Sequence, residues 1–132
     1  MARILAYPGM IKSPRKIEAV IHNALAFQKV RTEKGSFSAY LWGYTGGKSL
    51  IYHRHSDGYI PVTNGLAIQI ARDLKKRGFK FLGPVVMYSH LQACGIINDH
   101  DKNCPRFKDI TTHYPMKRCR RFLEQGVQYF GN

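Results

Sequence analysis

Apolar side chains recur at helical spacing over the first third of the chain. The clearest run comprises Ile17, Val20, Ile21, Ala24 and Phe27. Ser13 precedes this run as a suitable N-cap, Pro14 suits the first helical position, and Gly35 follows as a terminator. The pattern therefore predicts an amphipathic helix over residues 14–32.

Shorter helices are predicted on both sides of this one. Residues 2–7 (ARILAY) have the character of the last turns of a helix, which Pro8 and Gly9 would end. Downstream, Ser36 can cap a short helix that would place on one face Phe37, Tyr40 and Leu41.

Two more helices are predicted in the second half of the chain. Thr63 or Asn64 can cap a helix whose apolar face carries Leu66, Ile70 and Leu74. Cations complement the C-terminal end of a helix dipole and glycine suits the C-cap, which explains the run Lys75, Lys76, Arg77 and Gly78. Residues 84–94 follow Gly83 and are apolar almost all round, so they predict a core helix.

The remaining segments show no strand signal. Residues 43–62 are rich in glycine, have no clean period and predict a loop that carries His53 and His55. A His-x-His pair on a polar loop is usually solvated rather than a metal site. Residues 105–132 are basic, and residues 116–130 could form one short helix. Since no alternating pattern occurs, the predicted fold class is all-α.

Size and charge narrow the classes of function. A chain of 132 residues suggests one domain, and 44% hydrophobic residues suffice for a packed core. The 21 Lys and Arg residues against 8 Asp and Glu residues give a formal charge of +13. So large an excess predicts a polyanionic partner, either nucleic acid or an acidic membrane surface, and we favour nucleic acid.

The cysteines and the chain's start indicate the compartment. The three cysteines, Cys94, Cys104 and Cys119, cannot all pair within one chain. The opening MARILAYPGM lacks the long apolar core of a secretion signal, and no run of about 18 apolar residues could span a membrane. We therefore expect a reducing, cytoplasmic location of bacterial type, with cysteines as thiols or metal ligands.

Two histidine–cysteine pairs share the spacing H-x-x-x-C. His100 and Cys104, in the stretch NDHDKNC, form half of a candidate zinc site, because zinc usually takes four ligands, or three and water. His90 and Cys94 stand one turn apart on the predicted core helix. Such residues in a core helix are more often packed than chemically active.

Three segments carry a family resemblance: GMIKSPRKIEAVIHNALAF (residues 9–27), DLKKRGFKFLGP (residues 73–84) and YSHLQACGIINDHDKNC (residues 88–104). In this order and spacing they closely resemble the C-terminal half of the DNA-3-methyladenine glycosylase I family, and GSFSAYLW fits between the first two. The resemblance covers residues 7–104. We therefore divide the chain into residues 1–104, a part of that domain, and a basic tail, residues 105–132.

The resemblance implies a helix-hairpin-helix fold and a base-excision-repair enzyme. Members hydrolyse the N-glycosidic bond of 3-methyladenine in alkylated double-stranded DNA, which requires flipping the base and holding the backbone. The first segment would be the DNA-binding hairpin, with phosphate contacts from Gly9, Lys12, Arg15 and Lys16. Ser13 and Pro14 depart from the polar or basic residues usual in the family.

The resemblance also implies a structural zinc. In the family, the counterparts of His100 and Cys104 bind it together with a cysteine and a histidine from the extreme N-terminus. Asp99 could orient His100. From the residues alone, His113 and Cys119 could complete a four-ligand set, although their spacing matches no defined pattern.

The family's N-terminal cysteine, its key glutamate and its base-pocket aromatics have no counterpart in this sequence. We therefore expect an incomplete fold with no catalytic residue, and Asp99 is the one candidate substitute for the glutamate. One hypothesis is a piece of an active glycosylase, and the alternative is a non-catalytic basic nucleic-acid-binding fragment. Apolar faces of residues 14–32 and 84–94 would then be exposed and could mediate self-association.

Overall fold

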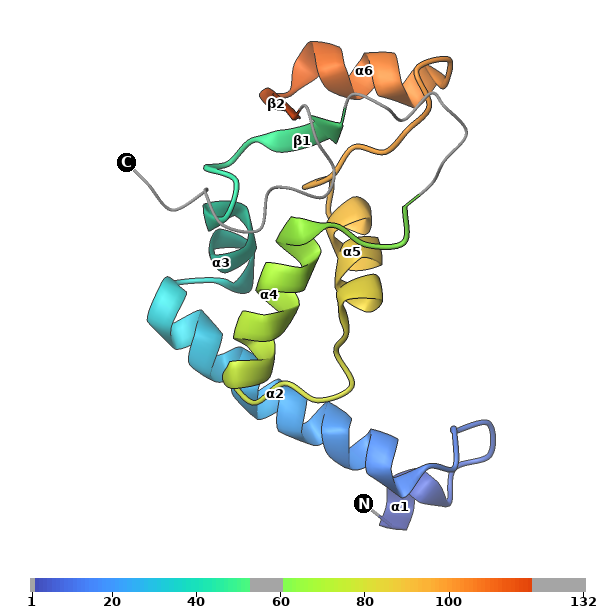
Figure 1. Ribbon diagram of the computed structural model, residues 1–132. Helices are drawn as coiled ribbons and strands as arrows, with labels where there is room; N and C mark the ends of the chain where they lie inside the picture. Colours follow the sequence, from blue (N-terminus) through green and yellow to red (C-terminus); the bar gives the residue numbers. More distant parts are fainter. Residues whose placement is uncertain (1, 53–60, 120–132) are drawn as a thin grey trace.

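The computed structural model describes residues 2–52 and 61–119 (Figure 1). In chain order the described elements are α1 (Ala2–Leu5), α2 (Pro14–Lys34), α3 (Phe37–Gly43), β1 (Ser49–Tyr52), α4 (Gly65–Lys76), α5 (Pro84–Ala93), α6 (Pro105–His113) and β2 (Met116–Cys119). The predicted helices over residues 14–32 and 84–94 and the two capped by Ser36 and Asn64 are all confirmed.

Side-chain caps explain where two of these helices begin. The Ser36 Oγ accepts a hydrogen bond from the Ala39 N–H at 2.8 Å, and the Asn64 Oδ1 accepts one from the Ala67 N–H at 2.8 Å. Each cap satisfies one of the four N–H groups that a helix N-terminus leaves without an internal partner. Asn64 is fully buried, so its cap also supplies a partner inside the core.

The hydrophobic core lies between α3, α4 and α5, with Val30 of α2 at its edge. The predicted face of α4 is buried: Leu66, Ile70 and Leu74 are at most 3% exposed. Strand β1 closes the core at the end away from α2 (Figure 1). The binary pattern of α4 therefore predicted its packing correctly.

The described part of the chain is mostly helical, as predicted, but it also contains a small parallel sheet that the all-α prediction did not include. Strand β1 pairs with β2 in the register Ser49 to Met116 and Tyr52 to Cys119. Residues 49–52 of the predicted loop over residues 43–62 form one strand, and residues 116–119 of the predicted helix over residues 116–130 form the other. Residues 53–60 and 120–130 of these two predictions lie outside the described residues. Each run is only four residues long, and partners so distant in sequence leave no local hairpin signal.

Helix α5 also departs from the prediction of a wholly buried helix. Met87, Tyr88 and Leu91 are buried, but Val85 and Val86 are 53% and 55% exposed. On α2, Val20 and Leu25 are likewise exposed. The expectation of exposed apolar faces on these two helices is therefore confirmed. In the described ranges, no helix is both long and apolar enough to cross a membrane.

Candidate functional site

A tight turn joins α1 to α2. The Met10 N–H donates to the Tyr7 carbonyl at 3.3 Å, and Gly9 has φ 90°. Proline at the second position and a positive-φ glycine at the third are the signature of a type II turn, which Pro8 and Gly9 fulfil. Because residues with a Cβ rarely adopt this φ, the turn requires Gly9.

The helix that follows this turn begins without a side-chain cap. Ser13 occupies the N-cap position of α2 in extended conformation, but its side chain makes no capping hydrogen bond. Pro14 has no N–H, and its ring presets the backbone for the first turn. The Ser13 N–H donates to the Ile11 carbonyl at 2.8 Å, and the Lys16 N–H donates to the Ser13 carbonyl at 3.1 Å. This end therefore presents chiefly the positive end of the dipole of a 21-residue helix.

Three predicted cations surround this helix start. Lys12, Arg15 and Lys16 are exposed, and in the described part of the chain none of them forms an ion pair. Arg15 and Lys16 stand in the first turn, where a positive charge opposes the helix dipole by about 0.3–1 kcal/mol each. Their placement thus costs stability, and an anionic ligand at the same point would reverse the sign of that effect.

The candidate zinc ligands His100 and Cys104 lie close together. Cys104 Sγ and His100 Nδ1 are 3.8 Å apart. His100 is exposed and Cys104 is half-buried at the start of α6. The pair therefore has the spacing of two ligands of one metal ion, since tetrahedral Zn–S and Zn–N bonds place these atoms about 3.6 Å apart.

The proposed four-ligand set is not assembled. Within residues 2–52 and 61–119, no three His, Cys, Asp or Glu side chains gather as they would to hold a metal. His113 Nδ1 lies 2.8 Å from the Asp109 carbonyl on α6, and Cys119 is buried on β2. The structure therefore does not bring His113 and Cys119 together with the first pair, and their role as zinc ligands stays a prediction. His53 and His55 fall outside the described residues.

Asp99 has its observed contacts with α5. Its Oδ2 accepts hydrogen bonds from the Tyr88 hydroxyl and, at 2.8 Å, from Gln92 Nε2. The backbone N–H of His100 is bound instead by Asn98 Oδ1 at 3.2 Å. These contacts give Asp99 a structural role that joins α5 to the segment after it.

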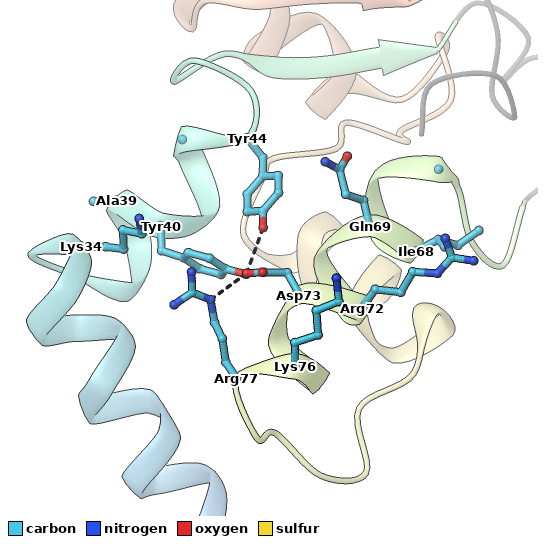
Figure 2. A pocket seen from close by; sticks show the side chains of 12 residues that line it. Lys34, Ala39, Tyr40, Tyr44, Ile68, Gln69, Arg72, Asp73, Lys76 and Arg77 are labelled. Carbon is cyan, nitrogen blue, oxygen red and sulfur yellow. Dashed lines mark hydrogen bonds and ion pairs between the residues drawn. The ribbon is translucent and has the colours of Figure 1, made fainter. Parts of the chain in front are cut away.

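A groove of about 770 Å³ lies between α3, α4 and the end of α2 (Figure 2). Four cations line it: Lys34, Arg72, Lys76 and Arg77. At its floor the Tyr40 hydroxyl donates to Asp73 Oδ2 at 2.7 Å. The Tyr44 hydroxyl lies 3.2 Å from that of Tyr40. Asp73 of α4 is half-buried within this network.

Arg77 connects three helices through this network. Its Nε donates to Asp73 Oδ2 at 2.7 Å, its Nη1 donates to Glu33 Oε2 at 2.5 Å, and its guanidinium lies 5.4 Å from the centre of the Tyr40 ring. Hydrogen bonds from Arg77 and Lys34 lower the pKa of Glu33 from 4.5 to about 2. Glu33 and Asp73 in turn raise the pKa of Arg77, which therefore remains charged.

The protonation states within the groove follow from the same contacts. Partial burial raises the pKa of Asp73, but hydrogen bonds from Arg77 and Tyr40 outweigh it and leave that pKa below its usual value. Burial, followed by the hydrogen bonds to Tyr44 and Asp73, raises the pKa of Tyr40. The carboxylate of Asp73 at the floor of the groove is therefore ionised, and it already accepts hydrogen bonds from the neutral phenol of Tyr40 and the guanidinium of Arg77. The surrounding cations make the groove suitable for an anion and unsuitable for a cationic base.

Sequence reasoning missed this groove. The network at the groove joins Glu33, Tyr40 and Asp73 from three separate helices, and no local motif links them. The only sequence signal was the cation run at the end of α4, which helix-dipole effects explain without any ligand.

Comparison with known proteins identifies relatives over most of the chain. Residues 1–107 match the sequence profile of the family described as methyladenine glycosylase. DNA-3-methyladenine glycosylase 1 of Escherichia coli (strain K12) is 32% identical over 102 residues, which are 77% of this chain and 54% of that protein. The DNA-3-methyladenine glycosylase of Haemophilus influenzae is 29% identical over 74% of this chain and 52% of its own length.

Solved structures agree with these sequence matches. The structure of 3-methyladenine DNA glycosylase I from Staphylococcus aureus has a TM-score of 0.70 and 38% identity, covering 79% of this chain and 55% of that one. A solution structure of 3-methyladenine DNA glycosylase I, which concerns alkylated base recognition, has a TM-score of 0.68 and 30% identity over 86% of this chain and 57% of that one. The chain spans about half the length of the relatives it matches.

Proposed function

The chain belongs to the methyladenine glycosylase family, and from this premise we propose that it binds double-stranded DNA through the turn at Gly9 and the N-terminus of α2. The turn and helix would form the hairpin of a helix-hairpin-helix motif. The observation that carries this proposal is the placement of Arg15 and Lys16 in the first turn of an uncapped helix, where they oppose the dipole. A backbone phosphate at this point would interact favourably with the positive end of the helix dipole and would neutralise these cations.

The salt dependence of binding tests this proposal. Fluorescence anisotropy with an undamaged labelled duplex should show sequence-independent binding that weakens as salt rises. The slope of log K against log salt should be several units negative, at about −0.9 for each phosphate contact. A flat salt response would contradict DNA binding and favour a membrane or protein partner.

For a complete domain of this fold we propose the activity of the relatives. That activity is hydrolysis of the N-glycosidic bond of 3-methyladenine in alkylated DNA, as a step of base-excision repair. For the chain of 132 residues by itself we propose DNA binding without base release. Two observations support this restriction. The carboxylates of Asp73 and Asp99 are engaged by neighbouring side chains, and the groove is lined by cations, which disfavour a cationic methylated base.

Chromatography of bases released from alkylated DNA tests this restriction. We expect the purified chain to release no 3-methyladenine above the rate seen with buffer alone. Release that Asp99→Ala abolishes would overturn the restriction and assign the catalytic carboxylate to Asp99. Release that survives Asp99→Ala would also overturn it and place the chemistry on other residues.

We further propose that His100 and Cys104 supply two ligands of a structural zinc, which their 3.8 Å separation supports. When bound, the zinc would brace the segment between α5 and α6. Metal analysis of protein purified without added zinc should find it, and His100→Ala should lower the zinc content. Unchanged content in that variant would contradict the assignment.

We also propose self-association through the exposed apolar side chains of α2 and α5, among them Val20, Leu25, Val85 and Val86. Sedimentation velocity over a range of concentrations should show a mass that rises with concentration, and Leu25→Lys should suppress the rise. A monomer at all concentrations would contradict this proposal.

A further inference from the structure

A second histidine–cysteine pair, His90 and Cys94, lies on the exposed side of α5. His90 Nε2 and Cys94 Sγ are 3.6 Å apart, and both residues are exposed to solvent. The sequence reading predicted that these two residues are packed within a core helix, and this prediction is wrong. The pair has the H-x-x-x-C spacing of His100 and Cys104, but it stands on a regular helix instead of a loop.

From this geometry we infer that His90 and Cys94 form a binding site for a borderline-soft divalent cation of the zinc class. Tetrahedral zinc with bonds of about 2.3 Å to sulfur and 2.05 Å to nitrogen holds these two atoms about 3.6 Å apart. The observed separation is 3.6 Å, which matches the distance between two ligands of one zinc ion. Thiolate and imidazole together favour this class over hard cations such as Mg²⁺, which prefer oxygen ligands.

The position of the pair on the helix also favours a cation. Helix α5 ends at Ala93 with Cys94 at the C-cap, so both ligands flank the last turn. The partial negative charge of a helix C-terminus stabilises a cation there. Without metal, the same two atoms make a weak contact between thiol and imidazole. Metal binding replaces this contact with two coordinate bonds, and the thiol proton passes to solvent.

The site would have two protein ligands and open coordination positions. In the described ranges no third His, Cys, Asp or Glu joins them. Water, or a donor group from another molecule, would fill the remaining positions. The bound metal would link residues one turn apart and thereby stabilise the last turn of α5.

A titration in the variant His100→Ala/Cys104→Ser isolates this site from the first pair. Protein kept reduced by a non-thiol reductant is titrated with Zn²⁺ by calorimetry and with Co²⁺ by absorption, and circular dichroism checks the fold. We expect one equivalent of Zn²⁺ and a thiolate-to-cobalt charge-transfer band. Adding Cys94→Ser should remove the band, and adding either Cys94→Ser or His90→Ala should weaken Zn²⁺ binding at least tenfold. Mg²⁺ should not compete.

Each contrary result overturns the inference. These are a folded His100→Ala/Cys104→Ser variant that binds no Zn²⁺, a cobalt band that survives Cys94→Ser, and a Zn²⁺ affinity that His90→Ala leaves unchanged. If the double variant unfolds, the same titration is carried out on the single variants Cys94→Ser and His90→Ala made in the wild-type chain. Each should bind one equivalent of Zn²⁺ less than wild type. An unchanged stoichiometry overturns the inference. Both positions are exposed, so these single substitutions should perturb folding little.

Discussion

Cations stand at both ends of α2, but those at its start are unfavourable to the helix dipole, whereas Lys34 at its end is paired with an acid. At its start, Arg15 and Lys16 oppose the helix dipole, and no described acid pairs with them. At its end, Glu33 pairs with both Lys34 and Arg77. The helix rises about 1.5 Å per residue, so its 21 residues separate the two ends by about 30 Å.

The difference shows why a count of charges does not locate a binding surface. The cations at the end of α2 and in the groove complement helix dipoles and acids, so the fold itself explains most of them. Those at the start reduce stability and have no structural explanation. The same contrast holds for two serines, because Ser36 caps α3 whereas the Ser13 side chain caps nothing.

The largest expected effect comes from removing the cations at the start of α2. The variant Lys12→Ala/Arg15→Ala/Lys16→Ala should bind duplex DNA about two orders of magnitude more weakly at 0.1 M salt, with a slope of log K against log salt reduced by roughly 2.7. Anisotropy at several salt concentrations measures both quantities.

A charge-matched variant provides the control. Lys34→Ala/Arg72→Ala/Lys76→Ala removes the same net charge from the groove. A smaller loss of affinity in this variant would support the comparison. Equal losses of affinity in the two variants would show that DNA binding depends only on total charge, and would contradict the proposal that DNA binds at the start of α2.

The next effect concerns stability at the other end of α2. Arg77→Ala removes the charged hydrogen bond to Asp73 and should lower the free energy of unfolding by about 1–2 kcal/mol, an amount reduced by partial exposure. Arg15→Ala should leave that free energy unchanged or raise it by a few tenths of a kcal/mol. Urea denaturation compares the two, and an equal loss in both would refute the contrast.

The two N-cap serines, Ser13 and Ser36, allow a test with a smaller expected effect on stability. Ser36→Ala should cost about 1 kcal/mol of unfolding free energy, because the Ala39 N–H loses its partner. Ser13→Ala should cost much less, since no capping bond is lost. The two thermal transitions report the difference, and a larger shift for Ser13→Ala would mean that the α2 cap forms in solution.

The smallest effect is a pH dependence confined to acid conditions. The pKa of Glu33 is lowered from 4.5 to about 2 in the folded chain, so its contribution to stability is present above 4.5 and is lost as the pH falls towards 2. Wild type should therefore lose the part of its advantage over Arg77→Ala that comes from the Glu33–Arg77 ion pair across this interval. A difference in unfolding free energy that stays constant from pH 5 to pH 2 would exclude the ion pair as its source.

Local signals made the helices predictable from sequence, and long-range contacts explain what was missed. Ser36, Asn64 and Pro14 mark helix starts because capping depends on neighbours only. The break in the chain after α1 was predicted for the same reason, since Gly9 acts through its own backbone angle. The groove network and the sheet were missed because their partners, such as Tyr40 and Asp73, meet only after the chain has folded.

The parallel pairing of β1 with β2 has a kinetic consequence. Ser49 and Met116 are separated by half the chain, and closing a loop of that size costs about 4 kcal/mol in entropy. Each of the helices α2 to α5 forms its turns from local contacts, and the contacts that join them, such as that of Tyr40 with Asp73, close shorter loops. The helical core should therefore assemble first and the strand pair last, with α6 carried into place by β2. Native-state opening should follow the reverse order, so amide protons of β2 should exchange well before those of α4.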